Sequence, residues 1–123
     1  MSKRVLSVGQ CGPDNATLKR FLKSHFDVDY VTADGHDDAL ASVRDGGADL
    51  VLVNRKLDAD YSDGMAVIEA IKAGDESAAT PVMLVSNFDD AQEKAVAAGA
   101  EPGFGKMALN DETANRLGAY LGN

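Results

Sequence analysis

The chain has 123 residues, a formal net charge of −8 and a hydrophobic fraction of 45%, which together predict one soluble globular domain spanning residues 1–123. The acidic balance argues against binding of nucleic acids or anionic membranes, because phosphate contacts require clustered Lys and Arg. The single cysteine, Cys11, excludes an internal disulfide and a multi-cysteine metal site. No apolar run approaches the roughly 18 residues of a membrane span. The run Val5–Val8 is too short for a signal peptide, so we expect a cytoplasmic protein.

Short apolar runs alternate with helical patterns along the whole chain. The predicted strands are Val5–Val8, Val28–Thr32, Asp49–Asn54, Pro81–Ser86 and a short, glycine-broken strand within Pro102–Lys106. The aliphatic run Leu50 to Val53 is typical of a strand that is buried on both faces of a parallel sheet. The strand Val28–Thr32 is more polar, which favours an edge position.

Each predicted strand is followed by a predicted helix. We expect Asp14 or Asn15 to cap the first helix and Asn110 to cap the last, while glycines end the helices between them. The fourth helix is the alanine-rich stretch Asp89–Ala98. The other helices are marked by Leu18, Phe21, Leu22, His25 and Phe26; by Ala39, Leu40 and Val43; by Met65, Ile68 and Ile71; and by Ala114, Leu117 and Leu121. Because parallel neighbours require right-handed crossover helices, this alternation predicts a doubly wound α/β fold of three layers, α/β/α.

The order and spacing of several motifs resemble the receiver domain of two-component response regulators, over nearly the whole chain. These motifs are Val5–Val8, Ala33-Asp34-Gly35, Asp49–Asn54, Asp63-Gly64, Pro81–Ser86, Gly99-Ala100 and Lys106. The resemblance implies a flavodoxin-like (CheY-like) five-stranded parallel sheet of order 2-1-3-4-5 with five helices. It also implies a phosphorylation switch. In that family an acidic pair and an aspartate bind Mg²⁺, and the aspartate takes a phosphoryl group from a histidine kinase.

Matched position by position, the chain keeps only part of the site that the resemblance implies. Ser86 falls at the family's hydroxyl position and Lys106 at its lysine position, so the side chains that contact phosphoryl oxygens are retained. Asn54 stands in place of the phosphoacceptor aspartate, and Gly9 and Gln10 stand in place of the acidic pair. The site is therefore degenerate on its acceptor side.

The segment around the fifth predicted strand also departs from the family pattern. Gly103 takes the place of the usual aromatic switch residue, with Phe104 one position later. Met107 replaces the proline that usually follows the lysine, and the loop from Asn54 to Gly64 is longer than usual. These departures concern the activity much more than the fold.

Phosphoryl transfer to a carboxylate needs an anionic oxygen nucleophile and a Mg²⁺ ion, which carboxylates and waters normally hold. With Gly, Gln and Asn at the three positions, those carboxylates are missing. We therefore predict no phosphorylation at Asn54, no metal or other cofactor, and no enzymatic activity. One alternative stays open, in which the chain is still phosphorylated, with Mg²⁺, on a displaced aspartate, Asp58 or Asp60.

Lys106 lacks its usual countercharges in this arrangement, and an unpaired buried ammonium group is costly. We expect Asp14, Asp58 or Asp60 to pair with it, or the side chain to point into solvent. Ser86 is either an anion contact or simply a polar strand end.

The resemblance also implies a protein partner. Receivers commonly use the face built by the fourth helix, fifth strand and fifth helix, which here comprises about Phe88–Ala98, Phe104 and Asn110–Tyr120. Phe88, Phe104 and Tyr120 are the candidate contact residues. The sequence thus predicts a pseudo-receiver, a signalling module that works through protein interaction without phosphorylation. Binding of a small ligand in the emptied pocket is a further possibility.

Overall fold

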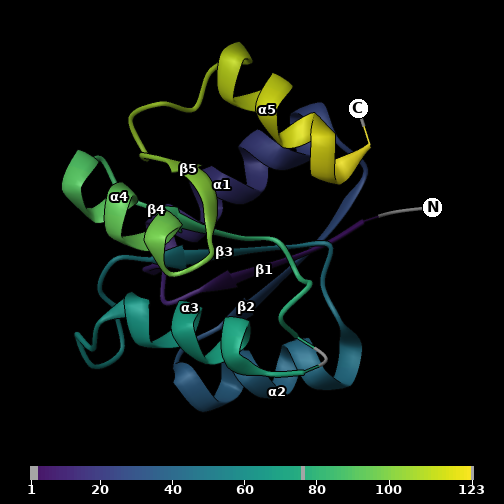
Figure 1. The fold of residues 1–123 in the computed structure, drawn as a ribbon. Helices are drawn as coiled ribbons and strands as arrows, with labels where there is room; N and C mark the ends of the chain where they lie inside the picture. The colour runs from purple at the N-terminus through teal and green to yellow at the C-terminus, as the bar shows by residue number, and fades with distance from the viewer. Residues whose placement is uncertain (1–2, 76, 123) are drawn as a thin grey trace.

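The computed structural model describes residues 3–75 and 77–122, and within them it contains one five-stranded parallel sheet. The strands are β1 (Lys3–Val8), β2 (Val28–Ala33), β3 (Leu50–Asn54), β4 (Val82–Val85) and β5 (Glu101–Phe104). The helices are α1 (Gly12–His25), α2 (His36–Gly46), α3 (Gly64–Ala73), α4 (Asp89–Ala97) and α5 (Asp111–Leu121). The strands lie in the order β2-β1-β3-β4-β5, so the predicted topology and the edge position of β2 are confirmed (Figure 1).

Helices cover both faces of the sheet, with α1 and α5 on one side and α2 and α3 on the other (Figure 1). Alternate residues of the central strand β3 supply the two cores. Leu50 and Leu52 pack with α1 and α5, whereas Val51 and Val53 pack with α2, α3 and Ala95 of α4. These four aliphatic residues of β3 are fully buried. This explains why the strand reads as an unbroken aliphatic run rather than as an alternation of apolar and polar residues.

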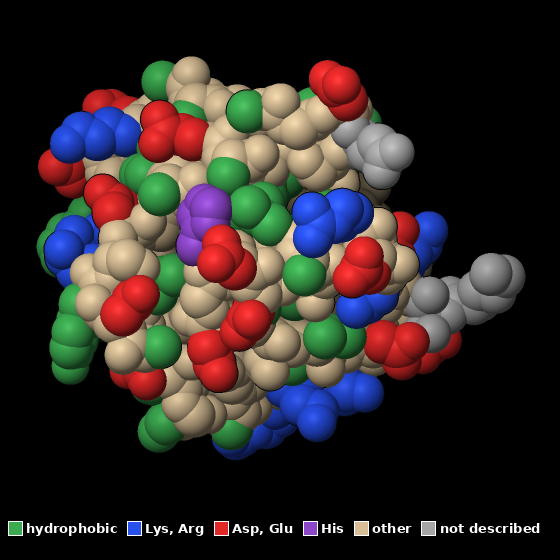
Figure 2. All heavy atoms as spheres, turned by 90° about the horizontal axis from the view of Figure 1, so that it is seen from below, with side chains coloured by type: hydrophobic (Ala, Val, Ile, Leu, Met, Phe, Trp, Pro, Cys, Tyr) green, Lys and Arg blue, Asp and Glu red, His purple; other side chains and the backbone are tan. Residues whose placement is uncertain are grey.

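The outer surface of the α2 and α3 layer is strongly charged. Figure 2 shows acidic side chains spread over this face, with basic side chains scattered among them and toward its edge. Among residues 3–75 and 77–122, no helix has the length and apolar character needed to cross a membrane.

The helix starts follow the predictions in part. Asn110 caps α5, since the Thr113 amide donates to its Oδ1 at 3.0 Å. The expected cap at Asp14 or Asn15 is wrong, because the N-cap position is taken by Cys11, three residues before Asp14. A proline near the helix start favours this earlier beginning, because its fixed φ is helical and its missing N–H would have no helical partner there. Asp14 and Asn15 lie in the first turn and are free to contact residues distant in sequence.

The pairing of β5 with β4 is irregular. Met83 pairs with Glu101 and Val85 pairs with Phe104, so β5 holds one residue more than β4 between the two pairs. Pro102 lies inside this bulge and has no N–H to donate to the ladder. The β4 carbonyls at this point therefore need a donor from elsewhere.

Gln92 of α4 supplies that donor. Its Nε2 donates to the carbonyl oxygen of Leu84 at 2.8 Å and to that of Ser86 at 3.1 Å. Its Oε1 accepts from the Gly103 amide at 3.1 Å. A Cβ at Gly103 would lie 2.1 Å from the Leu84 oxygen, so the close approach requires glycine. The Gln92 side chain ties α4 to the ends of both strands.

We predict that Gln92→Leu lowers the free energy of unfolding by about 2 kcal/mol, because it leaves buried backbone groups of β4 and β5 without partners. Denaturation in urea measures this loss, and faster hydrogen exchange of the Gly103 amide should accompany it. Glu93→Leu is the control, because it adds the same side chain at the next, exposed position of α4. Equal effects of the two substitutions would contradict the role of the Gln92 amide.

Candidate functional site

Three polar side chains from distant parts of the chain meet at the carboxyl end of the sheet. Asn54 is the last residue of β3, Lys106 follows β5, and Asp14 lies in the first turn of α1. The Lys106 Nζ donates to the Asp14 Oδ2 at 2.6 Å and to the Asn54 Oδ1 at 3.2 Å. We call these residues the Lys106 cluster. In open α/β sheets this edge is where ligands usually bind, so the cluster lies at the candidate functional site.

Both members of the ion pair are partly buried, with 29% of the Lys106 side chain and 35% of the Asp14 side chain exposed. The hydrogen bond from Lys106 lowers the pKa of Asp14 below its ordinary value of 3.8, although burial of the carboxyl opposes the shift. Of the three carboxylates expected as partners of Lys106, the structure brings Asp14 to it. In the part of the chain that the structure describes, no other carboxylate lies within 4 Å of the ammonium group.

The carboxamide of Asn54 is held by hydrogen bonds on both sides. Its Oδ1 faces Lys106, while its Nδ2 donates to the carbonyl oxygen of Lys56 at 2.7 Å and to that of Gly9 at 3.3 Å. This pattern fixes which atom is oxygen and which is nitrogen. A carboxylate in the same place would turn an oxygen toward two carbonyl oxygens. The geometry is thus suited to a neutral amide.

Leu57 occupies the space beside Gly9. Leu57 is fully buried, although it lies in an otherwise polar loop, and it belongs to the core cluster on the α2 and α3 side. Gly9 has a positive φ of 73°, and a Cβ built on it would lie 2.3 Å from the Leu57 Cδ2 and 2.9 Å from the Leu57 Cα. The Asp58 amide also donates to the Gly9 carbonyl oxygen at 2.9 Å. The loop after β3 therefore folds over the end of β1 and leaves no room for a side chain at position 9.

Gln10 follows directly and is 6% exposed. Within residues 3–75 and 77–122, neither its Oε1 nor its Nε2 has a hydrogen-bond partner. Its backbone oxygen, by contrast, accepts from the Asn15 Nδ2 at 3.2 Å. A buried amide without hydrogen-bond partners costs free energy, so this side chain destabilises the folded state.

Ser86 serves the local backbone. Its Oγ accepts from the Phe88 amide at 3.1 Å, which shapes the turn before α4. Asp58 and Asp60, the other two carboxylates expected to pair with Lys106, are exposed. Hydrogen bonds from Ser62 lower the pKa of Asp60, whereas Asp58 contributes its backbone amide to Gly9. Within the described residues, no cluster of three His, Cys, Asp or Glu side chains could hold a metal ion.

The three aromatic residues predicted to contact a partner differ in exposure. Phe88 is 58% exposed, and the Arg55 guanidinium lies over its ring at 5.1 Å from the centroid. The expectation for Phe104 is wrong, because it is only 5% exposed and packs in the core on the α1 and α5 side. Tyr120 is half-buried, and its hydroxyl donates to the Glu101 Oε1 at 2.8 Å. Burial raises the pKa of Tyr120.

Sequence reasoning missed Leu57 and Gln92 as residues that shape the site. A single leucine inside the polar loop 55–61 was the available signal for the first. Gln92 left no such signal, because a glutamine in a helix is usually exposed.

We predict that Gln10→Leu raises the free energy of unfolding by about 1 kcal/mol, because it removes a buried amide that has no partners. The same change at Gln92 should have the opposite sign, so the two variants form a matched pair. Chemical denaturation under identical conditions measures both. If Gln10→Leu lowered the free energy of unfolding as much as Gln92→Leu, the Gln10 amide would have to be hydrogen-bonded, against the prediction.

We also predict a specific pH dependence for Asp14→Asn. Because the pKa of Asp14 is lowered in the folded state, its charge stabilises the fold above the ordinary value of 3.8, and this contribution is lost as the pH falls below it. With partial exposure, the difference from the wild type should be at most about 1 kcal/mol at pH 7. It should vanish in strongly acidic solution.

Urea denaturation from pH 7 down to pH 3 measures this difference. Asp34→Asn, which removes an exposed carboxylate before α2, controls for the change in net charge. Identical pH profiles for the two variants would contradict the pairing of Asp14 with Lys106.

Comparison with known proteins finds solved structures that resemble this one. No protein-family model matches the chain, and no curated protein sequence matches it. A putative response regulator from Chloroflexus aurantiacus J-10-fl superposes with a TM-score of 0.87 at 16% identity, with both chains covered completely. The receiver domain of a DNA-binding response regulator (merR) from Colwellia psychrerythraea 34H gives a TM-score of 0.76 at 25% identity, with 93% of each chain covered.

NtrX from Brucella abortus gives a TM-score of 0.81 at 23% identity. The match covers 98% of this chain but only 27% of the NtrX chain, so the chain spans about a quarter of that protein. Together with the strand order and the two helical layers, these likenesses establish the architecture. This chain has the CheY-like fold of response regulator receiver domains.

Proposed function

We propose that this chain is a pseudo-receiver, a non-enzymatic signalling module that binds a protein partner without being phosphorylated. The observation that supports this most directly is the Lys106 cluster. The ammonium group already has an anionic partner in Asp14 and a neutral one in the carboxamide of Asn54. A neutral amide is a very weak nucleophile, and the positive charge that would contact a phosphoryl group is already paired.

The residues present do not fit Mg²⁺, which phosphorylation of a receiver requires. Gly9 has no side chain and no room for one beside Leu57. Gln10 is neutral, and the ammonium group of Lys106 lies 3.2 Å from the one Asn54 oxygen that faces the site. A second cation beside that ammonium would be repelled, so no step of the proposed function passes through a metal.

The proposed partner surface is a groove of about 460 Å³ between α4 and β5. It is lined by Gln92, Glu93, Val96, Ala97, Pro102 and Gly103. The hydrogen bond from the Gly103 amide to the Gln92 Oε1, at 3.1 Å, joins the two walls of the groove. Val96 is 44% exposed and gives the surface an apolar contact. Because Phe104 is buried, this groove replaces it as the centre of the proposed face.

The negative charge of α4 and α5 indicates what kind of partner would bind this face. The first turns of α4 and α5 carry the acidic residues Asp89, Asp90, Asp111 and Glu112, and the chain as a whole has a net charge of −8. A protein segment that inserts an apolar side chain into the groove and carries basic residues beside it would complement this face.

We predict that the wild-type chain shows no phosphoryl adduct by intact mass after incubation with acetyl phosphate and Mg²⁺. Asn54→Asp should show none either, because positions 9 and 10 still provide no carboxylates. This variant should also lose about 1 kcal/mol of stability, since its carboxylate faces two carbonyl oxygens.

The double variant Asp58→Asn/Asp60→Asn identifies the alternative acceptor. A stoichiometric adduct on the wild type that disappears in this variant would establish phosphorylation on a displaced aspartate. An adduct that appears only in Asn54→Asp would show that the chain still binds Mg²⁺ at this site. The first result would overturn the proposed function. The second would contradict the conclusion that the residues present do not fit Mg²⁺.

A further inference from the structure

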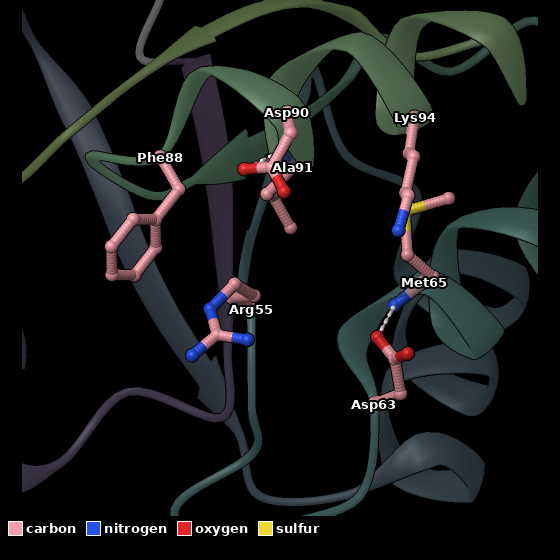
Figure 3. Close-up of a pocket in the computed structure, with 8 residues that line it drawn as sticks. Arg55, Asp63, Met65, Phe88, Asp90, Ala91 and Lys94 are labelled. Atoms are coloured by element: carbon pink, nitrogen blue, oxygen red, sulfur yellow. Dashed lines mark hydrogen bonds between the residues drawn. The ribbon is translucent and has the colours of Figure 1, made fainter.

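A second cavity lies apart from the Lys106 cluster, between α4 and the segment that follows β3. Its volume is about 320 Å³, which is at the small end of the range for small-molecule sites. It is lined by Arg55, Asp63, Met65, Leu84, Phe88, Asp90, Ala91 and Lys94. Figure 3 shows Phe88 and Arg55 on one side of it, and on the other side Lys94, which extends from α4 toward the start of α3.

The charged side chains of this cavity are not paired with one another. Asp63 accepts from the Met65 amide at 2.9 Å, and Asp90 accepts from the Ala91 amide at 3.0 Å. Each carboxylate is thus bound to the backbone near the start of its own helix. Within residues 3–75 and 77–122, Arg55 and Lys94 have neither an ion pair nor a side-chain hydrogen bond. The cavity therefore offers two basic groups whose donors are available to a ligand.

The rest of the lining is apolar. Leu84 forms a fully buried part of the wall, and Met65 and Ala91 are partly buried beside it. Phe88 is 58% exposed, and its ring already carries the Arg55 guanidinium at 5.1 Å. This contact orients the planar guanidinium, and an oriented guanidinium binds a carboxylate with two parallel hydrogen bonds. A flat apolar group could pack against these side chains at little cost.

We propose that this cavity binds a small aromatic carboxylate. Its carboxylate contacts Arg55 and Lys94, and its ring packs against Met65, Leu84 and Ala91. A single negative charge fits best, because Asp63 and Asp90 also line the cavity and would repel a dianion such as phosphate. The proposal concerns none of the residues of the Lys106 cluster and does not depend on whether the chain is phosphorylated.

Binding can be tested on the unmodified chain by ¹⁵N NMR, with benzoate and its neutral counterpart benzamide as probes and with chloride to hold ionic strength constant. We expect benzoate to shift the amide signals of Arg55, Met65, Phe88, Ala91 and Lys94 saturably, with a Kd in roughly the millimolar range for so small a ligand. Benzamide should bind at least about fivefold more weakly, since it lacks the charge. Inorganic phosphate should give no saturable shift at these residues.

Substitutions then test whether Arg55 and Lys94 bind the carboxylate of benzoate. Arg55→Gln and Lys94→Gln should each weaken benzoate binding by about fivefold to tenfold. Arg20→Gln and Lys23→Gln, on the exposed surface of α1, remove the same charges elsewhere and should change the affinity by less than about twofold. Benzoate and benzamide of equal affinity would overturn the proposal, as would benzoate shifts that map outside the cavity or equal losses in the control variants. The comparison of the two probes needs no variant, so it stands even if a substitution perturbs the fold.

Discussion

The ion pair between Lys106 and Asp14, with the Asn54 carboxamide as its neutral third member, is the interaction on which the character of this site depends. A lysine at the carboxyl end of a parallel sheet needs a countercharge when it is partly buried. In this chain the countercharge comes from α1, while the strand end contributes only a neutral oxygen. The cationic end of Lys106 is thus satisfied within the chain, and the one carboxylate of the Lys106 cluster, that of Asp14, is already paired with it.

The surroundings of this pair are consistent with the same conclusion. Leu57 closes the space where Gly9 would need a side chain, and the Asn54 nitrogen is directed at two backbone oxygens. At the β5 edge of the sheet, the Gln92 side chain bonds α4 to Leu84 of β4 and to Gly103 of β5. Leu57, the Asn54 amide and Gln92 are thus packed or neutral groups that are fixed by their contacts. These features support the proposed function, in which the chain acts through a surface whose charge does not change.

The parts of the fold that could be predicted from sequence were those set by local pattern. The run Leu50 to Val53 indicated a doubly buried strand, and Asn110 indicated a helix cap, because both signals depend on neighbours in the chain. Asp14 was predicted as a cap for the same local reason. Its contact with a lysine 92 residues away decided its role instead, and among the carboxylates available the sequence could not rank it first.

Two further misses also have physical causes. Phe104 was expected at the surface, but the extra residue in β5 disturbs the register with β4, and its side chain packs in the core. Leu57 stands alone in a polar loop, and periodicity gives no information about a single residue. In both cases a contact between segments distant in the chain decided the outcome.

The most direct test of the central claim is paramagnetic broadening by Mn²⁺, which substitutes for Mg²⁺ and reports binding without any assumption about catalysis. We expect the amide signals of Gly9, Gln10, Asn54 and Lys106 to be no more broadened than those of exposed acidic residues on α2. Saturable broadening centred on these four residues would show that the site still holds a divalent cation, and would contradict a pseudo-receiver whose lysine is satisfied by Asp14 and Asn54.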